Sequence, residues 1–288
     1  MATDRSARRV RPADVGWYVL LTGLSVIVLF PVWMTIVRAL ANPSKSLLQT
    51  RPKLYPVDVQ WDAFGKAFTA GNLGRPLIYS LAVTMLVVIG QTITSVLAAY
   101  AFAFLRFPLK RLLFALTVAT LLLPIEVTLI TNVRTFQSLG WVGTCQNPAQ
   151  ALGAMVLPFL ATALGIFLVR QGFLGIPKDL RDAATLDGYG HLRFLWKVAV
   201  PVTRPIIGSF VLISFLGAYN QYVWPRQVIT QTRNNTVQLA LRAVAGQDLG
   251  HFNLPFASAI IAAFPVLILL IAFQRQLVRG LTAGAVKG

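Results

Sequence analysis

The chain has 288 residues, of which 56% are hydrophobic and only 12% are charged, and its mean hydropathy is +0.67. Soluble domains carry about 25% charged residues, so this composition excludes an ordinary soluble protein and predicts an integral membrane protein. One Cys and two His exclude a disulfide framework and a metal centre built from Cys or His. The net charge of +17 reflects a shortage of acidic residues rather than a basic cluster, which argues against a nucleic-acid partner.

Six apolar runs are long enough to cross a hydrocarbon layer about 30 Å thick as helices. Backbone groups in lipid must bond within their own segment, and no alternating barrel pattern is present, so all six runs are predicted to be α-helical. Arginines precede the first run, as in a signal peptide, but its apolar part is too long, and we interpret it as a retained span. The predicted spans are 17–38, 77–105, 111–132, 149–173, 202–224 and 254–274.

The distribution of Lys and Arg predicts the orientation, because cytoplasmic segments are enriched in these residues. Sixteen of the 26 fall in segments that are inside if the N-terminus is cytoplasmic. Both termini are therefore predicted to be cytoplasmic. We expect one integral membrane domain with no soluble domain, and the expected parts are a cytoplasmic segment 1–16, a membrane domain 17–274 and a cytoplasmic tail 275–288.

The predicted inner loop 174–201 is the most informative segment. Pro177 stands where a first helical turn tolerates proline, and the residues that follow up to Leu186 contain no helix breaker, so a short helix is predicted. We expect Leu180, Ala183, Ala184 and Asp187 to share one side of it. Small side chains on that side would let another surface come close to the backbone.

A turn and a second helix are predicted after this short helix. Gly188 and Gly190 permit a sharp turn. An amphipathic stretch with Phe194, Leu195 and Val198 at helical spacing follows and ends at Pro201. The loop is thus predicted to form a helix-turn-helix that projects into the cytoplasm, although a solvated loop lying on the membrane surface has the same composition.

The spacing in this loop resembles a family signature. Asp182-Ala183-Ala184, three residues, Gly188, nine residues and Val198-Ala199-Val200-Pro201 are similar to the EAA signature of ABC importer permeases, with Asp182 where the family usually has Glu. The resemblance implies a coupling helix that fits a groove on a separate ATPase subunit. The implied ATPase-coupling residues are Asp182, Ala183, Ala184, Asp187, Gly188 and Pro201.

The resemblance extends over most of the chain. The tail 274–288 is similar to the end of MalG-like carbohydrate-uptake permeases, which implies an all-α fold with six transmembrane helices of the MalG-like, type I kind. In that family the tail enters the interface between two ATPases, so Thr282, Gly284 and Lys287 are implied to lie there. A flexible tail without fixed contacts is the alternative.

Three shorter stretches narrow the resemblance to permeases of sn-glycerol-3-phosphate and glycerophosphodiester importers: Arg106 to Leu109, Leu123 to Val127, and Tyr219 to Pro225. The implied partners are a homologous permease subunit, two ATPase subunits that hold ATP and Mg, an extracytoplasmic solute-binding protein and the lipid of a bacterial inner membrane. The chain has no phosphate-binding loop of the G-x-x-x-x-G-K-[ST] type. It is therefore predicted to bind no cofactor and to have no ATPase site of its own.

Four polar residues in or beside the spans are candidates for the solute pathway. Glu126 is the only acidic residue within a predicted span, where a charge faces a polar cavity or pairs with a neighbouring helix. Asn220, Gln221 and Tyr222 lie at the predicted outer end of the fifth span, although Tyr222 and Trp224 also suit an interfacial aromatic belt.

The predicted function is the permease subunit of an ATP-driven, binding-protein-dependent importer of glycerophosphate compounds. Import of a sugar or oligosaccharide by the same machinery is an alternative. An ion-coupled secondary transporter that uses Glu126 is a distant one, and it gives the inner-loop signature no role. A membrane enzyme is disfavoured because His191 and His251 fall on opposite sides of the predicted membrane. The outer loop 225–253 is long enough to reach a binding protein.

Overall fold

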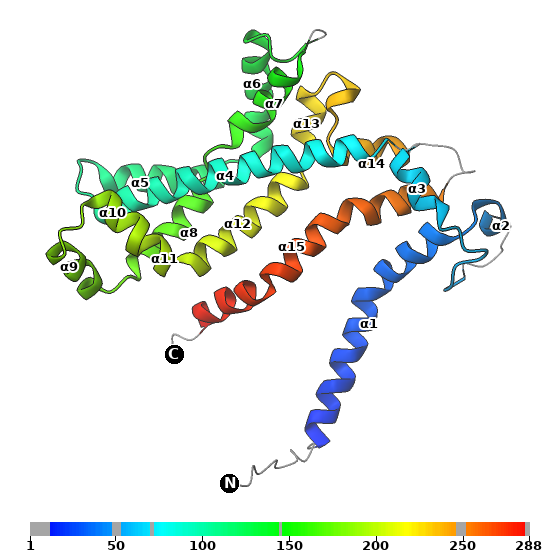
Figure 1. The fold of residues 1–288 in the computed structure, drawn as a ribbon, viewed down its shortest axis with the longest axis horizontal. Helices are drawn as coiled ribbons and strands as arrows, with labels where there is room; N and C mark the ends of the chain where they lie inside the picture. The colour runs from blue at the N-terminus through cyan, green and yellow to red at the C-terminus, as the bar shows by residue number, and fades with distance from the viewer. Residues whose placement is uncertain (1–11, 48–52, 70–71, 144–145, 246–251, 286–288) are drawn as a thin grey trace. The chain divides into compact units, whose positions relative to one another are not determined.

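The computed structural model describes residues 12–47, 53–69, 72–143, 146–245 and 252–285. Within that part of the chain every regular element is a helix and there is no strand, as predicted (Figure 1). The α-helices are α1 (Pro12–Leu40), α2 (Pro43–Leu47), α3 (Asp62–Thr69), α4 (Gly74–Phe104), α5 (Lys110–Ala119), α6 (Ile125–Ser138), α7 (Pro148–Val156), α8 (Ala163–Leu174), α9 (Lys178–Leu186), α10 (His191–Phe194), α11 (Val200–Val202), α12 (Arg204–Tyr219), α13 (Val223–Val228), α14 (Val237–Ala245) and α15 (Asn253–Ala285). The short 3₁₀ or π segments are η1 (Thr120–Leu122), η2 (Leu157–Phe159), η3 (Leu195–Ala199) and η4 (Thr232–Asn234).

Three of the predicted spans correspond to continuous apolar helices, Val15–Leu40, Gly74–Phe104 and Asn253–Gln274. Two others, 111–132 and 149–173, correspond to pairs of helices that meet at a bend, and the fifth, 202–224, begins at the bend of a third pair whose first half lies in the predicted inner loop. The bend is 99° between Lys110–Leu122 and Val127–Ser138, 49° between Pro148–Phe159 and Ala163–Leu174, and 79° between His191–Val202 and Arg204–Tyr219.

A proline lies at or near each of these bends. Leu123 is extended because the residue before a proline disfavours the helical conformation, and Pro124 follows it at the start of α6. Pro158 lies in the first turn of η2, and Pro205 in the first turn of α12, where a missing amide donor costs nothing. A long apolar run in this sequence is therefore not always one straight helix.

The described chain divides into two compact units. The larger unit comprises residues 72–243 and 262–288, and the smaller comprises residues 1–71 and 244–261.

In the larger unit, α8 and α12 pack along the central helix α4 (Figure 1). Gly165 of α8 makes the closest approach possible, because a Cβ atom there would overlap with the Ser95 hydroxyl and the Phe210 ring. Side-chain hydrogen bonds also join the helices, from Ser214 Oγ to Gln91 Oε1 at 2.7 Å and from Thr94 Oγ1 to the Leu160 carbonyl. Small residues and internally paired polar groups are how helices associate in lipid.

Two aromatic clusters close the ends of this bundle. The Tyr100 cluster (Tyr100, Phe104, Phe173 and Phe194) lies where α4 and α8 end and α10 begins. The Trp224 cluster (Phe136, Trp141, Phe159 and Trp224) joins α6, η2 and α13.

The smaller unit is held by an alanine-rich contact. The end of α1, α3 and the start of α15 meet around Ala39, Ala63 and Ala257, which are almost fully buried. The rest of α1 exposes apolar side chains along its length, as a helix that contacts lipid or another membrane subunit does. Beyond α1, Lys45 forms an ion pair with Asp58 at 2.9 Å, and this contact holds the pKa of the Asp58 carboxyl below its usual value.

Candidate functional site

The helix α9 begins immediately after Pro177, whose extended backbone precedes the first helical residue, Lys178. Asp179 lies in the first turn, where a negative charge is favoured by the helix dipole. Pro177 thus lies one residue before the first turn rather than within it. The helix nevertheless begins where the sequence predicts its start.

The end of α9 is a Schellman turn, which explains Gly188. The Gly188 amide donates to the Thr185 carbonyl at 3.0 Å, and the Tyr189 amide donates to the Ala184 carbonyl at 2.9 Å. Gly188 has a φ of +73°, a conformation that side chains with a Cβ rarely adopt. Gly190 has an ordinary φ of −73°, so the prediction that both glycines serve the turn holds only for Gly188.

The second helix of the loop is not uniform. Its first turn is α10, its middle is the π-helical segment η3, and its last turn is α11, which extends past the expected end at Pro201 to Val202. Thr203 then marks the 79° bend into α12, and its buried hydroxyl donates to the Ala199 carbonyl at 2.7 Å. π-Helical turns are rare and occur mostly at functional positions.

The Tyr100 cluster attaches this loop to the membrane helices. The Tyr100 hydroxyl and His191 Nδ1 are joined by a 3.0 Å hydrogen bond. The Phe194 ring packs edge-on against Phe104 with 5.4 Å between centroids. The Arg181 guanidinium lies 5.8 Å from the Phe104 centroid, at a hollow of about 300 Å³ that α9 and α10 share with the end of α4.

Ala184 was expected to share one side of the helix with Ala183 and Asp187, and the structure places it differently. Ala184 is 5% exposed and packs into the chain's own core beside the Tyr100 cluster. Asp182, Ala183 and Asp187 are exposed. The predicted coupling residues thus separate into one that holds α9 in place and three whose side chains are free to meet another surface. Pro201 is half-buried at the junction with α12.

The outer pathway candidates lie at the junction of α12 and α13. Asn220 caps α12, and its Oδ1 accepts a hydrogen bond from Gln238 Nε2 at 3.3 Å. The Tyr222 hydroxyl accepts a hydrogen bond from Arg226 at 2.6 Å. Gln221, which lies between Asn220 and Tyr222 in the sequence, is half-buried. These residues form a small amide and phenol group beside a cation.

Trp224 does not lie in an interfacial aromatic belt. Its ring is 4% exposed at the centre of the Trp224 cluster, and its indole Nε1 donates to the Ala154 carbonyl at 3.1 Å. It is a packing residue, so the aromatic-belt interpretation is wrong for Trp224.

Several candidates fall at the edge of the described structure. Glu126 lies in the first turn of α6, just after the bend at Pro124, and its side chain is outside the described residues. Thr282 and Gly284 lie within α15, which runs beyond the predicted span to Ala285, while Lys287 lies outside the described part. The side chains of the tail, like that of Glu126, are not described.

The outer loop 225–253 is largely folded. It contains the rest of α13, then η4 and α14, and the Val237 amide donates to Ser80 Oγ of α4 at 2.7 Å. Asn234 of this loop is only 1% exposed. Gln146, which the sequence reasoning overlooked, donates to the Val228 carbonyl at 2.8 Å and joins the α6–α7 connection to α13.

The sequence reasoning also overlooked Tyr100 and His191 as structural partners. Tyr100 and Phe104 are four residues apart in an otherwise apolar run, which places both rings on one side of a helix. This spacing was the sequence signal that could have placed Tyr100 and Phe104 together on one side of α4. No comparable signal marked His191.

No group of three or more His, Cys, Asp or Glu that could hold a metal ion occurs within the described residues.

Comparisons with known proteins agree with this architecture. The sn-glycerol-3-phosphate transport system permease protein UgpE of Yersinia pestis bv. Antiqua (strain Antiqua) is 28% identical over 279 residues, covering 94% of this chain and 96% of that protein. UgpE of Brucella abortus (strain 2308) is 30% identical over 276 residues, covering 93% and 95%.

Two solved structures have the same fold. A chain of a bacterial ABC transporter involved in the import of the acidic polysaccharide alginate matches with a TM-score of 0.78 at 20% identity, covering 93% of this chain and 98% of that one. A chain of the bacterial alginate ABC transporter in complex with its alginate pentasaccharide-bound periplasmic protein matches with a TM-score of 0.61 at 14% identity, covering 91% and 95%. The fold is thus that of an ABC importer permease.

The family model of the binding-protein-dependent transport system inner membrane component matches residues 91–283. This stretch contains the α9–α10 loop, the pathway candidates and α15 up to residue 283. The chain therefore belongs to the family of binding-protein-dependent transport system inner membrane components, permease subunits whose ATPase is a separate polypeptide.

Proposed function

We propose that this chain is the permease subunit of an ATP-driven importer of sn-glycerol-3-phosphate or glycerophosphodiesters. It forms half of the translocation pathway with a homologous UgpA-like permease. Two UgpC-like ATPase subunits bind ATP and Mg, and a UgpB-like protein delivers the solute from outside. The UgpE relatives that cover almost the whole chain support this substrate class. Both termini lie in the cytoplasm in this proposal.

One observation carries the mechanism: Asp182, Ala183 and the C-cap residue Asp187 of α9 are exposed, while Ala184 of the same helix is buried in the chain's own core. A coupling helix needs an exposed side for its partner and a rigid attachment to the membrane helices, and α9 has both. We assign α9 as the helix that the ATPase grips. The short Asp182 side chain reaches one methylene less far than the Glu usual at this position.

Motion of α9 reaches the membrane helices by two routes. One passes through Ala184, Tyr189 and the Tyr100 cluster to α4 and α8. The other passes along α10, η3 and α11 to the bend at Thr203 and into α12. Because these contacts are packed rather than loose, closure of the ATPases would move the inner ends of α4, α8 and α12 together and open the path to the opposite side.

The pathway residues in this proposal are Glu126, Asn220, Gln221 and Tyr222. The amide groups and the phenol hydrogen-bond a polar solute, and Arg226, which donates to Tyr222, is a cation beside them. A guanidinium next to amide donors suits a phosphate-bearing solute. The tail residues Thr282, Gly284 and Lys287 enter the ATPase interface, and the extension of α15 to Ala285 supports a helical tail.

The docking assignment is tested by site-specific crosslinking. The chain has a single Cys, so replacing Cys145 by Ser provides a background without cysteine. Ala183→Cys and Asp187→Cys should crosslink to the ATPase in the assembled complex, and the yield should change when ATP binds. Ala184→Cys is the matched control, because Ala184 is buried whereas the adjacent Ala183 is exposed. Equal crosslinking from positions 183 and 184, or none from either exposed position, would overturn the assignment.

The substrate is tested separately by reconstituting the four-component importer in vesicles with its binding protein. ATP-dependent uptake of radiolabelled sn-glycerol-3-phosphate is the expected result. Uptake of a sugar or oligosaccharide instead, with the same ATP dependence, would replace the substrate and keep the machinery. Uptake by this chain alone, driven by an ion gradient, would refute the ABC mechanism.

A further inference from the structure

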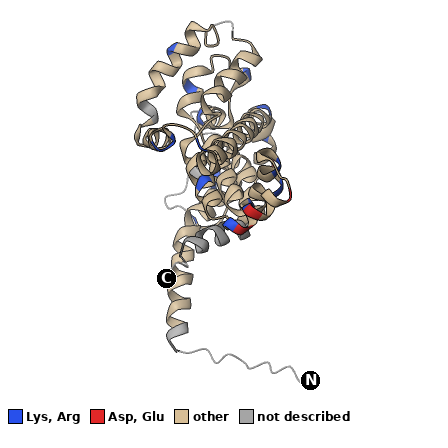
Figure 2. Cartoon of the chain, turned by 90° about the vertical axis from the view of Figure 1, so that its left-hand side faces the viewer, with Lys and Arg blue, Asp and Glu red and all other residues tan. Residues whose placement is uncertain are grey.

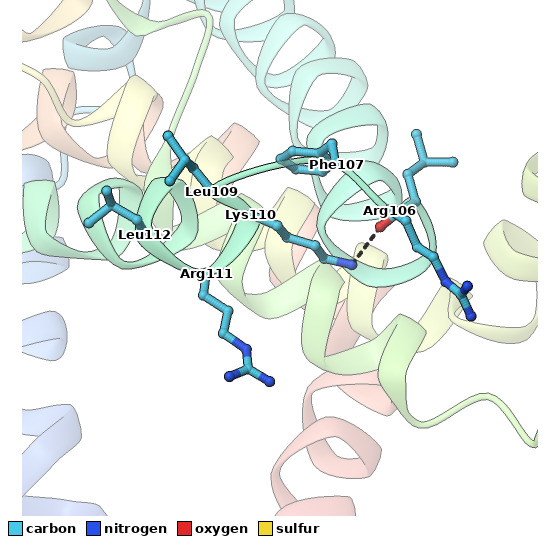
Figure 3. A pocket seen from close by; sticks show the side chains of 7 residues that line it. Arg106, Phe107, Leu109, Lys110, Arg111 and Leu112 are labelled. Atoms are coloured by element: carbon cyan, nitrogen blue, oxygen red, sulfur yellow. Dashed lines mark hydrogen bonds between the residues drawn. The ribbon is translucent and has the colours of Figure 1, made fainter.

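The connection between α4 and α5 carries an uncompensated positive charge. Arg106, Lys110 and Arg111 line a surface hollow of about 500 Å³ (Figure 3). The sequence contains no acidic residue between Asp62 and Glu126, and none of the three cations forms an ion pair with a described residue. Lys and Arg occur on several helices, and acidic residues are few (Figure 2).

Lys110 is fixed in this hollow by the end of α4. Its Nζ donates to the Leu105 carbonyl at 2.8 Å and to the Ala103 carbonyl at 3.3 Å (Figure 3). Arg106 and Arg111 extend from the two ends of the connection with Lys110 between them, and both are exposed. Lys110 and Arg111 also lie in the first turn of α5, where the helix dipole disfavours a positive charge. An anion in the hollow would relieve this repulsion.

The same connection exposes apolar side chains beside the cations. Leu109 is 68% exposed and Leu112 is 53% exposed, and both line the hollow. Leu109 has a φ of +56°, a conformation that costs a residue with a side chain about 1–2 kcal/mol, and yet it packs against little of its own chain. The site is thus basic at its centre and apolar at its edge.

The hollow lies at the end of the larger unit that holds the α9–α10 loop. Leu105, which lines it, packs against the same buried cluster as Ala184 and Phe194. This end is predicted to be cytoplasmic, where the bilayer surface is rich in anionic lipid. A headgroup phosphate would match the cations, and an acyl chain would match the leucines. An acidic protein surface would match only the charge.

We propose that Arg106, Lys110 and Arg111 form a binding site for the headgroup of an anionic phospholipid whose acyl chain lies along Leu109 and Leu112. The two arginines contact the phosphate, and Lys110, already bonded to α4, sets the depth at which the headgroup sits. The lipid would hold the α4–α5 connection at the membrane surface beside the loop that α9 and α10 form.

The test uses the detergent-purified importer complex, freed of lipid and titrated with phosphatidylglycerol, with bound lipid counted by native mass spectrometry. The wild-type complex should retain phosphatidylglycerol in preference to phosphatidylcholine, and the preference should fall as salt is raised. The R106Q/R111Q double variant should bind phosphatidylglycerol roughly 30-fold more weakly, because each cation near an anionic surface contributes roughly a fivefold factor. R106K/R111K should keep most of the affinity.

The K197Q/R204Q double variant is the matched control, because it removes two exposed cations from the same predicted side, away from the hollow. An equal loss of lipid in this control would overturn the site in favour of general surface charge. Equal affinity of the wild-type complex for the two lipids would also overturn it. Displacement of the lipid by millimolar inorganic phosphate would identify a small-anion site instead. Loss of the ATPase subunits from R106Q/R111Q with unchanged lipid binding would identify a protein contact.

Discussion

Replacement of Gly188 by Val should uncouple ATP hydrolysis from transport. A Cβ atom at Gly188 would have nothing within 4 Å, so the cost is conformational rather than steric. At φ +73° that cost is about 1–2 kcal/mol for a residue with a Cβ, and a β-branched residue lies at its upper end. Such an energy changes the population of the native turn about 5- to 30-fold. The two hydrogen bonds that the Gly188 and Tyr189 amides donate at the end of α9 would then be lost in much of the population.

The assay compares ATP hydrolysis with solute uptake in reconstituted vesicles. Gly188→Val should insert and assemble normally, because the turn is exposed and outside the helical core. Uptake per ATP hydrolysed should fall at least fivefold. Gly188→Asn should retain most of the coupling, since Asn tolerates the left-handed conformation.

Gly190→Val is the control for this reasoning. Gly190 also has open space around its Cβ position, but its φ of −73° suits any residue. Its replacement should therefore leave coupling nearly unchanged. If Gly190→Val were as harmful as Gly188→Val, or if Gly188→Val transported normally, the Schellman turn would not be what orients α9.

Three further predictions follow from the packing. Tyr100→Phe removes the hydrogen bond to His191, worth about 0.5–1.5 kcal/mol, and should raise the ATP consumed per solute imported while assembly is retained; an unchanged ratio would argue against the route through α4. Gly165→Leu should prevent recovery of the assembled complex on size-exclusion chromatography because it overlaps with α4 and α12, whereas Gly217→Leu, which has open space, should not. Glu126→Ala should alter the uptake rate without loss of co-purifying subunits, and loss of assembly would instead support a structural role.

The sequence predicted the class of fold and the position of the helix-turn-helix formed by α9 and α10 for physical reasons that act locally. Long apolar runs without charge have only the helix available to them in lipid. The start of α9 at Lys178 and its end at Gly188 follow from backbone preferences of Pro, Gly and the residues between them. The family signature then connected this loop with a separate ATPase.

The bends within the apolar runs were not predicted, although the sequence contains part of the signal for them. Pro124, Pro158 and Pro205 each lie at or near a break, but proline inside a membrane helix can also be tolerated when neighbouring groups satisfy the freed carbonyls. Hydropathy averages over the bend, so an apolar run looks the same whether it is straight or broken.

Local chemistry in the chain thus determined that this protein is a bundle of membrane helices with a short exposed helix, α9, between two of them. Tertiary structure alone decided which side of that helix is free. Ala183 and Ala184 are adjacent and chemically identical, but one is exposed and the other is buried beside Tyr100 because α4 and α10 converge there from positions about ninety residues apart. Helical periodicity relates residues along one helix, and it carries no information about which distant helix will cover them.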